Sequence, residues 1–198
     1  MAHLMRDYIS GQISDAQGVF ARMLADETLL STVEAIVDRC VTCLRGGGKI
    51  LLAGNGGSAA DAQHIAAELV SRFAVERQGL AAIALTTDTS ILTAIGNDYA
   101  FDRVFARQVQ ALGTKGDVFV GYSTSGKSAN VLRAFEAARA KDMICVGLTG
   151  NRGGAMREAC DHLLEVPSDA TPKIQEGHLV LGHIICGLIE RGMLTAEG

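Results

Sequence analysis

Apolar residues repeat at helical spacing over residues 4–24 and again over residues 28–44. A period near 3.6 residues is typical of amphipathic helices, and the glycines at 46–48 end the second segment, so two helices are predicted. A helical hairpin placed ahead of a larger core has an apolar face to cover. Pairing with another subunit covers such a face, so the pattern predicts self-association.

Beyond residue 48 the pattern changes to short apolar runs that are separated by helix-length segments. The runs are residues 50–53, 80–85, 118–122, 144–148 and 162–166, and a last long helix is predicted over about 173–193. This alternation predicts an α/β fold, a five-stranded parallel sheet with helices on both faces. In such a sheet ligands bind beyond the carboxyl ends of the strands, so the loops there are expected to hold the site.

The length of 198 residues and the hydrophobic content of 48% suit one well-buried domain. We predict a single domain over residues 1–198, with residues 1–48 used in oligomerisation and residues 49–198 forming the α/β core. A net charge of −4 without a Lys/Arg cluster argues against a nucleic-acid partner. No apolar run approaches the roughly 20 residues of a membrane span, and no signal-peptide pattern opens the sequence. We therefore expect a cytoplasmic protein without a membrane partner.

The cysteines are odd in number and fall mostly within runs that read as helix or buried strand. They are Cys40, Cys43, Cys145, Cys160 and Cys186. Cys40 and Cys43 form a C-x-x-C, but they lie inside a helical pattern without a second pair. We interpret the cysteines as small core residues in a reducing compartment.

The segment from Lys49 to Glu68 combines an apolar run, a glycine-rich turn and an amphipathic helix that is predicted to begin at Ser58 or Asp61. Backbone amides at such a turn point outward at the positive end of the helix and bind anions, most often phosphate. His64 and Glu68 follow four residues apart on one helical face, so a polar pair lies near the anion site. Asp61 is interpreted either as a helix cap or as a site residue.

The same turn also fits a dinucleotide-binding pattern. Gly54, Gly56 and Ala59 match G-x-G-x-x-A, with Glu76 roughly where an acid for the ribose lies. Two features count against it: the turn is not at the start of the fold, and it carries the polar side chains of Asn55 and Ser58.

A second loop presents a different nucleotide-binding pattern. Residues 121–128, GYSTSGKS, match the Walker A sequence letter for letter, with a predicted strand before and a helix after. However, no later strand ends in an acid that serves magnesium. The loop is built from hydroxyls, which together with a helix N-terminus suit a single phosphomonoester: Ser123, Thr124, Ser125 and Ser128.

These motifs, in this order, resemble the sugar isomerase (SIS) domain and, within it, the phosphoheptose isomerases. The resemblance is carried by Gly54-Asn55-Gly56-Gly57-Ser58, His64, Glu68, Gly96-Asn97-Asp98, Ser123-Thr124-Ser125-Gly126, Ser128-Ala129-Asn130, Ile174-Gln175-Glu176 and His183. It covers nearly the whole chain, including the two leading helices. Lys127 departs from the Asn more usual at its position, and this departure creates the Walker-like string.

The resemblance implies a flavodoxin-like three-layer sandwich that assembles as a homotetramer with active sites at subunit junctions. The implied reaction is reversible conversion of sedoheptulose 7-phosphate into D-glycero-D-manno-heptose 7-phosphate, towards heptose for lipopolysaccharide or capsule. Two alternatives remain: a non-catalytic partner protein of the same fold, as in the replication-initiator-associating members, and a P-loop phosphotransferase. The presence of both Glu68 and His183 favours an enzyme.

An aldose–ketose isomerase removes a C–H proton next to a carbonyl and stabilises the resulting enediolate. Glu68 is the predicted base and His183 the predicted acid. Four residues resemble the zinc ligands of the family, His64, Glu68, Gln175 and His183, and the metal is expected to act as a Lewis acid. Because Glu68 is hard to use as a tight ligand and a free base at once, we expect a shifting coordination.

The remaining predicted site residues bind the substrate. Asn55, Gly56, Gly57 and Ser58 are expected to meet the sugar or its phosphate, Asn97 and Asp98 the sugar hydroxyls, and Ser123, Thr124, Ser125 and Ser128 the phosphate, with Gln175 also in contact. Asp61 is predicted to help open the sugar ring. Without the resemblance, Gln175 and His183 also fit two unrelated surface positions. His178 is interpreted as a packed histidine rather than a ligand, and His3 and His162 as structural.

Overall fold

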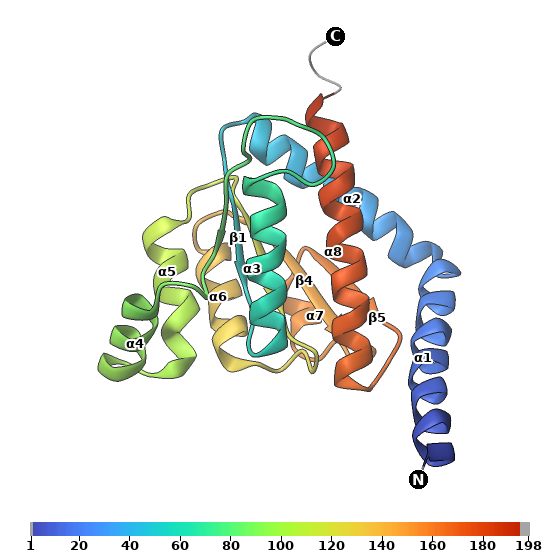
Figure 1. Cartoon of the computed structure of the whole chain (residues 1–198). Coiled ribbons are helices and arrows are strands. Elements are labelled where there is room, and N and C mark those ends of the chain that lie inside the picture. Colours follow the sequence, from blue (N-terminus) through green and yellow to red (C-terminus); the bar gives the residue numbers. More distant parts are fainter. Residues whose placement is uncertain (1, 195–198) are drawn as a thin grey trace.

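The computed structural model describes residues 2–194; Met1 and residues 195–198, which the domain prediction includes, lie outside the described residues. Figure 1 shows the elements in space. In chain order they are α1 (Ala2–Leu24), α2 (Glu27–Arg45), β1 (Ile50–Ala53), α3 (Gly57–Val70), β2 (Ala82–Ala84), α4 (Thr89–Asp98), the 3₁₀ helix η1 (Phe101–Arg103), α5 (Val104–Leu112), β3 (Val118–Tyr122), α6 (Ala129–Arg139), β4 (Ile144–Gly150), α7 (Met156–Ala159), β5 (His162–Val166) and α8 (Thr171–Leu194).

The strands of residues 2–194 form one parallel sheet in the order β2-β1-β3-β4-β5, which confirms the predicted flavodoxin-like α/β fold. Leu52 of β1 pairs with Val120 of β3, and Val120 with Val146 of β4. The strand order reverses between β1 and β3, because β2 lies outside β1 while β4 and β5 lie beyond β3. Crevices at such a switch point are where open α/β sheets bind ligands.

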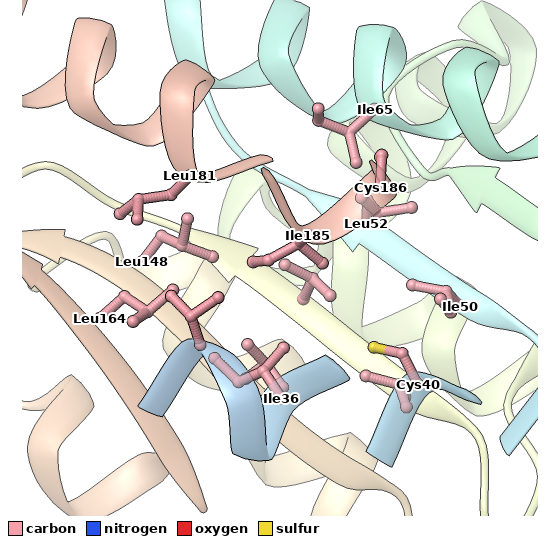
Figure 2. Close-up of a cluster of buried hydrophobic side chains, with 14 of the residues drawn as sticks. Ile36, Cys40, Ile50, Leu52, Ile65, Leu148, Leu164, Leu181, Ile185 and Cys186 are labelled. Carbon is pink, nitrogen blue, oxygen red and sulfur yellow. The ribbon is translucent and has the colours of Figure 1, made fainter. Parts of the chain in front are cut away.

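Side chains of each strand alternate between two apolar cores, one on each face of the sheet. Ile50 and Leu52 point into the core that α2, α3 and α8 cover, whereas Leu51 and Ala53 point into the core on the side of α5 and α6. Figure 2 shows the first core, where side chains from α2, α3 and α8 meet those of the strands. Fully burying one Leu or Ile contributes roughly 1.5–3 kcal/mol, so this layering is a main source of stability.

Element boundaries differ slightly from those predicted. β2 is shorter than residues 80–85, β4 continues to Gly150, and α8 begins at Thr171 with Pro172 in its first turn, where the missing N–H costs no hydrogen bond. The link between β4 and β5 holds only the four-residue helix α7 among its described elements rather than a full helix. α3 begins at Gly57, one residue before the predicted start at Ser58 and four before the alternative at Asp61.

The first half of α1 has little to pack against within the chain. Leu4, Met5, Tyr8, Ile9 and Ile13 are all more than half exposed, while the buried apolar residues of the hairpin lie further along. Figure 1 shows α1 projecting beyond the sheet. This exposed apolar face is what the sequence pattern predicts for a self-associating hairpin.

The cysteines are unpaired, and four of them are buried, in agreement with core packing: Cys40, Cys43, Cys145 and Cys186. Burial raises the pKa of the Cys40 thiol to about 12, so it stays protonated and unreactive at neutral pH. Within residues 2–194 no helix combines the length and the apolar character that crossing a bilayer requires.

Candidate active site

Two loops meet at the switch point, one between β1 and α3 and the other between β3 and α6. In the first loop Gly54 packs so closely on the next helix that an added Cβ would lie 2.6 Å from the carbonyl oxygen of Ser58. Gly56 is the N-cap of α3 with a φ of 57°, a conformation that favours glycine. The glycines therefore place the N-terminus of α3 at the sheet edge without a capping side chain. Glu76 lies before β2, is exposed and pairs with Arg72. It is therefore not at the end of β2, where the dinucleotide pattern requires an acid for the ribose.

The side chain of Asn55 connects the two loops. Its amide nitrogen donates to Oδ1 of Asn130 at 2.9 Å, and the amide nitrogen of Asn130 donates to Oδ1 of Asn55 at 2.8 Å. Asn130 is buried in the first turn of α6. Asn130 belongs to the motif that carries the family resemblance, but its bonds to Asn55 were not predicted. The one sequence signal for them was the position of Asn130 just after the hydroxyl loop.

The hydroxyl loop is held by its own side chains. The Oγ atoms of Ser123 and Ser128 lie 2.8 Å apart, and Oγ of Ser125 accepts from the amide of Lys127 at 3.3 Å. Ser128 is the N-cap of α6, without a capping bond from its side chain. The loop thus combines hydroxyls with a helix N-terminus, as predicted for an anion site. β4 ends in Thr149 and Gly150 without an acid for magnesium, as the sequence indicated.

Three predicted site residues converge where α3 and α8 lie side by side. The ligand atoms of His64, Glu68 and His183 all lie within 4.8 Å of one another. Nε2 of His64 is 2.7 Å from Nε2 of His183 and 3.5 Å from Oε1 of Glu68. Two imidazoles and a carboxylate form a zinc-type donor set. Four-coordinate zinc holds its nitrogen ligands about 3.3 Å apart, so the residues fit a metal after a modest widening of the histidine pair.

The close approach of α8 to α3 depends on small residues. An added Cβ at Gly182 would lie 2.6 Å from Ile65, and one at Gly57 would lie 2.6 Å from Nε2 of Gln175. The contacts advance in the same direction along both helices, so α3 and α8 pack in parallel. His183 therefore lies opposite His64, whereas the amide of Gln175 lies against the start of α3, two turns of α8 earlier. Its role as a fourth ligand stays a prediction.

Asp61 lies in the second turn of α3, between the glycine-rich loop that precedes the helix and the cluster of His64, Glu68 and His183. Because the helix begins at Gly57, the interpretation of Asp61 as its cap was wrong. Its Oδ2 atom is buried without a hydrogen-bond partner in the described part of the chain. Burial raises the pKa of the Asp61 carboxyl above its ordinary value, and the neighbouring His64 offsets this only in part. Asp61 is thus a desolvated acid near the predicted site.

His178 is fully buried on α8, which confirms its interpretation as a packed histidine. One ring nitrogen, Nε2, lies 3.1 Å from the carbonyl oxygen of Thr149, and the ring makes an edge contact with Tyr122. Burial lowers the pKa of His178 to about 4, although the bond to Thr149 opposes this. The folded state therefore keeps this imidazole neutral at pH values where the unfolded chain protonates it.

That difference predicts an acid-sensitive contribution to stability. The free energy of unfolding is expected to fall as the pH drops from 6.5 towards 4, by up to about 3 kcal/mol from His178 alone. Denaturant titrations at pH 7, 5.5 and 4.5 measure it, with H178Q as the comparison, because glutamine keeps a donor for Thr149 but does not titrate. If the difference between the two proteins is the same at all three pH values, the prediction fails.

Asn97 and Asp98 do not join the cluster within one subunit. Nδ2 of Asn97 donates to Oδ1 of Asp98 at 2.9 Å, at the end of α4. α4 packs on η1 and α5, on the face of the sheet opposite α3 and α8. Asp98 lines a cavity there together with Tyr99 and Arg107.

Comparison with known proteins agrees with this architecture. A family model described as SIS domain matches residues 14–150. A phosphoheptose isomerase from Burkholderia pseudomallei is 69% identical over 190 residues, which cover 96% of each chain. One from Aneurinibacillus thermoaerophilus is 54% identical over 189 residues, again 96% of each. The solved structure of a phosphoheptose isomerase from Neisseria gonorrhoeae superposes with a TM-score of 0.89 at 45% identity, covering 94% of this chain and 99% of that one.

Fold and relatives together define an enzyme of carbohydrate metabolism, a sugar isomerase. The chain belongs to the SIS domain family and, within it, to the phosphoheptose isomerases. The alternatives of a non-catalytic partner protein and of a P-loop phosphotransferase are not favoured.

Proposed function

We propose that this enzyme interconverts sedoheptulose 7-phosphate and D-glycero-D-manno-heptose 7-phosphate through a metal-assisted enediolate. The observation that carries the proposal is the convergence of His64, Glu68 and His183 on α3 and α8, the first of which begins at the glycine-rich loop after β1. The product would supply heptose for lipopolysaccharide or capsule, in the cytoplasm. Relatives that share more than half of the residues bear the name phosphoheptose isomerase, which supports this choice of substrate.

Glu68 and His183 supply the proton transfers. The carboxylate of Glu68 removes the proton from the carbon beside the carbonyl, and His183, as the acid, donates a proton to the neighbouring oxygen. A single zinc ion, held by His64, Glu68, Gln175 and His183, would act as a Lewis acid on the two sugar oxygens. Gln175 must turn from Gly57 towards His183 to join this set. Because Glu68 serves two roles, we expect it to alternate between ligand and base.

The substrate phosphate is assigned to the hydroxyl loop and the helix ends beside it. Ser123, Thr124, Ser125 and Ser128 would hold it, with the amides of Gly56, Gly57 and Ser58 nearby. His64 comes seven residues after Gly57, about 10 Å along the axis of α3. An extended seven-carbon sugar with its phosphate at one end has a comparable length. Asp61 lies between the two ends, where it would assist opening of the sugar ring.

Assembly as a homotetramer with active sites at subunit junctions is part of the proposal. The cluster of His64, Glu68 and His183 is open to solvent, since the His64 side chain is 44% exposed and that of Glu68 24%. A neighbouring subunit would close it and exclude water. It would also bring polar groups, and Asn97 and Asp98, which lie on the opposite face of their own subunit, are suited to contact the sugar hydroxyls of a neighbour. The exposed apolar face of α1 supports such an assembly.

The test is turnover of sedoheptulose 7-phosphate in D₂O by the purified protein, together with elemental analysis. An enediolate route predicts one deuterium incorporated at C2 of the aldose product, and about one zinc per subunit. Activity should fall on dialysis against a chelator and return with zinc. Turnover without deuterium from the solvent would contradict the exchange expected of Glu68, and no turnover would contradict the substrate.

A further inference from the structure

A buried ion pair fixes the segment that follows α3. The carboxylate of Glu190, on α8, is 2% exposed and accepts from the amides of Phe73, Ala74 and Val75 at 2.8–3.0 Å. Its Oε2 also accepts from Nε of Arg77 at 3.1 Å. A single acidic side chain thus satisfies consecutive amides of an irregular segment, which are groups that cannot be left unpaired when buried.

Arg77 attaches the same pair to the end of α3. Its Nη2 donates to the carbonyl oxygen of Glu68 at 3.0 Å, and its Nη1 donates to those of Leu69, Ser71 and Gln78 at 2.9–3.3 Å. Carbonyls in the last turn of a helix lack partners within the helix, and a cation there is favourable. The guanidinium therefore caps the helical turn that carries Glu68.

The pair also reaches His183. The ring of Phe73, whose amide Glu190 holds, lies with its centroid 5.8 Å from that of His183. An added Cβ on Gly187, one turn further along α8, would lie 3.2 Å from Phe73, so the ring is closely seated on α8. Arg77 thus bonds the carbonyl of Glu68, and Glu190 fixes the backbone of Phe73, whose ring contacts His183.

We propose that Arg77 and Glu190 are positioning residues, which set the distance and orientation of Glu68 relative to His183. Stability alone is a weak reason for a buried ion pair, because apolar residues of similar volume often serve as well. A pair that links the two segments carrying the acid and the base has a further role. This inference rests on the proposed function, in which Glu68 and His183 transfer protons. Neither Arg77 nor Glu190 touches the substrate.

The test compares E190Q with D117N, a control that removes the charge of a second buried ion pair. Asp117 is also fully buried, pairs with Lys49 at 2.7 Å and accepts from backbone amides, but its partners are Lys49 and Thr114 rather than the segments that carry Glu68 and Phe73. Both variants should lose thermal stability. At a temperature where both remain folded, E190Q is expected to lower kcat by 10- to 100-fold with KM changed less than 2-fold, while D117N keeps the wild-type kcat.

F73L tests the same link without disturbing a buried charge, so it remains informative if E190Q does not fold. It is expected to lower kcat about 10-fold with little change in unfolding temperature. Equal kcat in wild type, E190Q and F73L would overturn the inference, as would an equal loss in D117N.

A spectroscopic readout separates this inference from the proposed function. In protein labelled with ¹⁵N-histidine, the signals of His64 and His183 should move in E190Q and F73L and stay in place in D117N. If the wild type does not turn over sedoheptulose 7-phosphate, the proposed function fails, and the NMR result decides the inference by itself. Unmoved histidine signals in both variants would overturn it.

Discussion

Replacing Glu68 with Gln is expected to lower kcat by about 1,000-fold and to abolish deuterium exchange from solvent into the sugar. The amide has nearly the same shape as the carboxylate, so α3 and α8 should keep their packing. It cannot accept a proton from carbon, and it binds zinc more weakly than a carboxylate. KM should change much less than kcat, because Glu68 lies about 16 Å along α3 from Gly57, at the predicted phosphate seat. Steady-state kinetics and mass spectrometry of the product in D₂O measure both effects.

The control for this substitution is E76Q. Glu76 is 86% exposed and pairs with Arg72 in the segment after α3, so E76Q removes one negative charge from the same region outside the cluster of His64, Glu68 and His183. We expect wild-type kcat in E76Q. Full turnover by E68Q would show that the base is another residue, and Asp61, the desolvated acid two turns earlier on α3, would be the next to test.

Much of the fold was predictable because its determinants are local. Short apolar runs that alternate with helix-length segments, such as residues 118–122, predict buried parallel strands. The glycines after β1 predict the turn into α3. The boundaries were less accurate where tertiary contacts decide them. β4 continues to Gly150 because it pairs with Val166 of β5, and this pairing is not visible in the apolar run that ends at Leu148.

The site was predictable only in part for a related reason. His64 and Glu68 share a helical face, so spacing alone places them together, and the resemblance to the family adds His183. The reciprocal bonds of Asn55 and Asn130, and the pair of Arg77 with Glu190, join residues 75 and 113 positions apart, and no periodicity connects them. The partly buried environment of Asp61 arises from tertiary packing, so the sequence left two interpretations open, a helix cap and a site residue.

His183 offers the second large effect, because its place in the cluster depends on two helices that are distant in sequence. H183N is expected to bind zinc at least about 100-fold more weakly and to lower kcat by about 100- to 10,000-fold. Asparagine keeps a polar group near the position of Nδ1 but leaves nothing at Nε2, the atom that lies 2.7 Å from Nε2 of His64. Competition with a zinc-binding dye and elemental analysis after dialysis measure the affinity, and kinetics at saturating zinc separate loss of metal from loss of the acid.

H162N, a change on the edge strand β5, should match the wild type in both measurements. Zinc affinity unchanged in H183N would place the metal elsewhere, whereas weak binding with kcat restored at saturating zinc would leave His183 as a ligand and assign the proton transfer to another group.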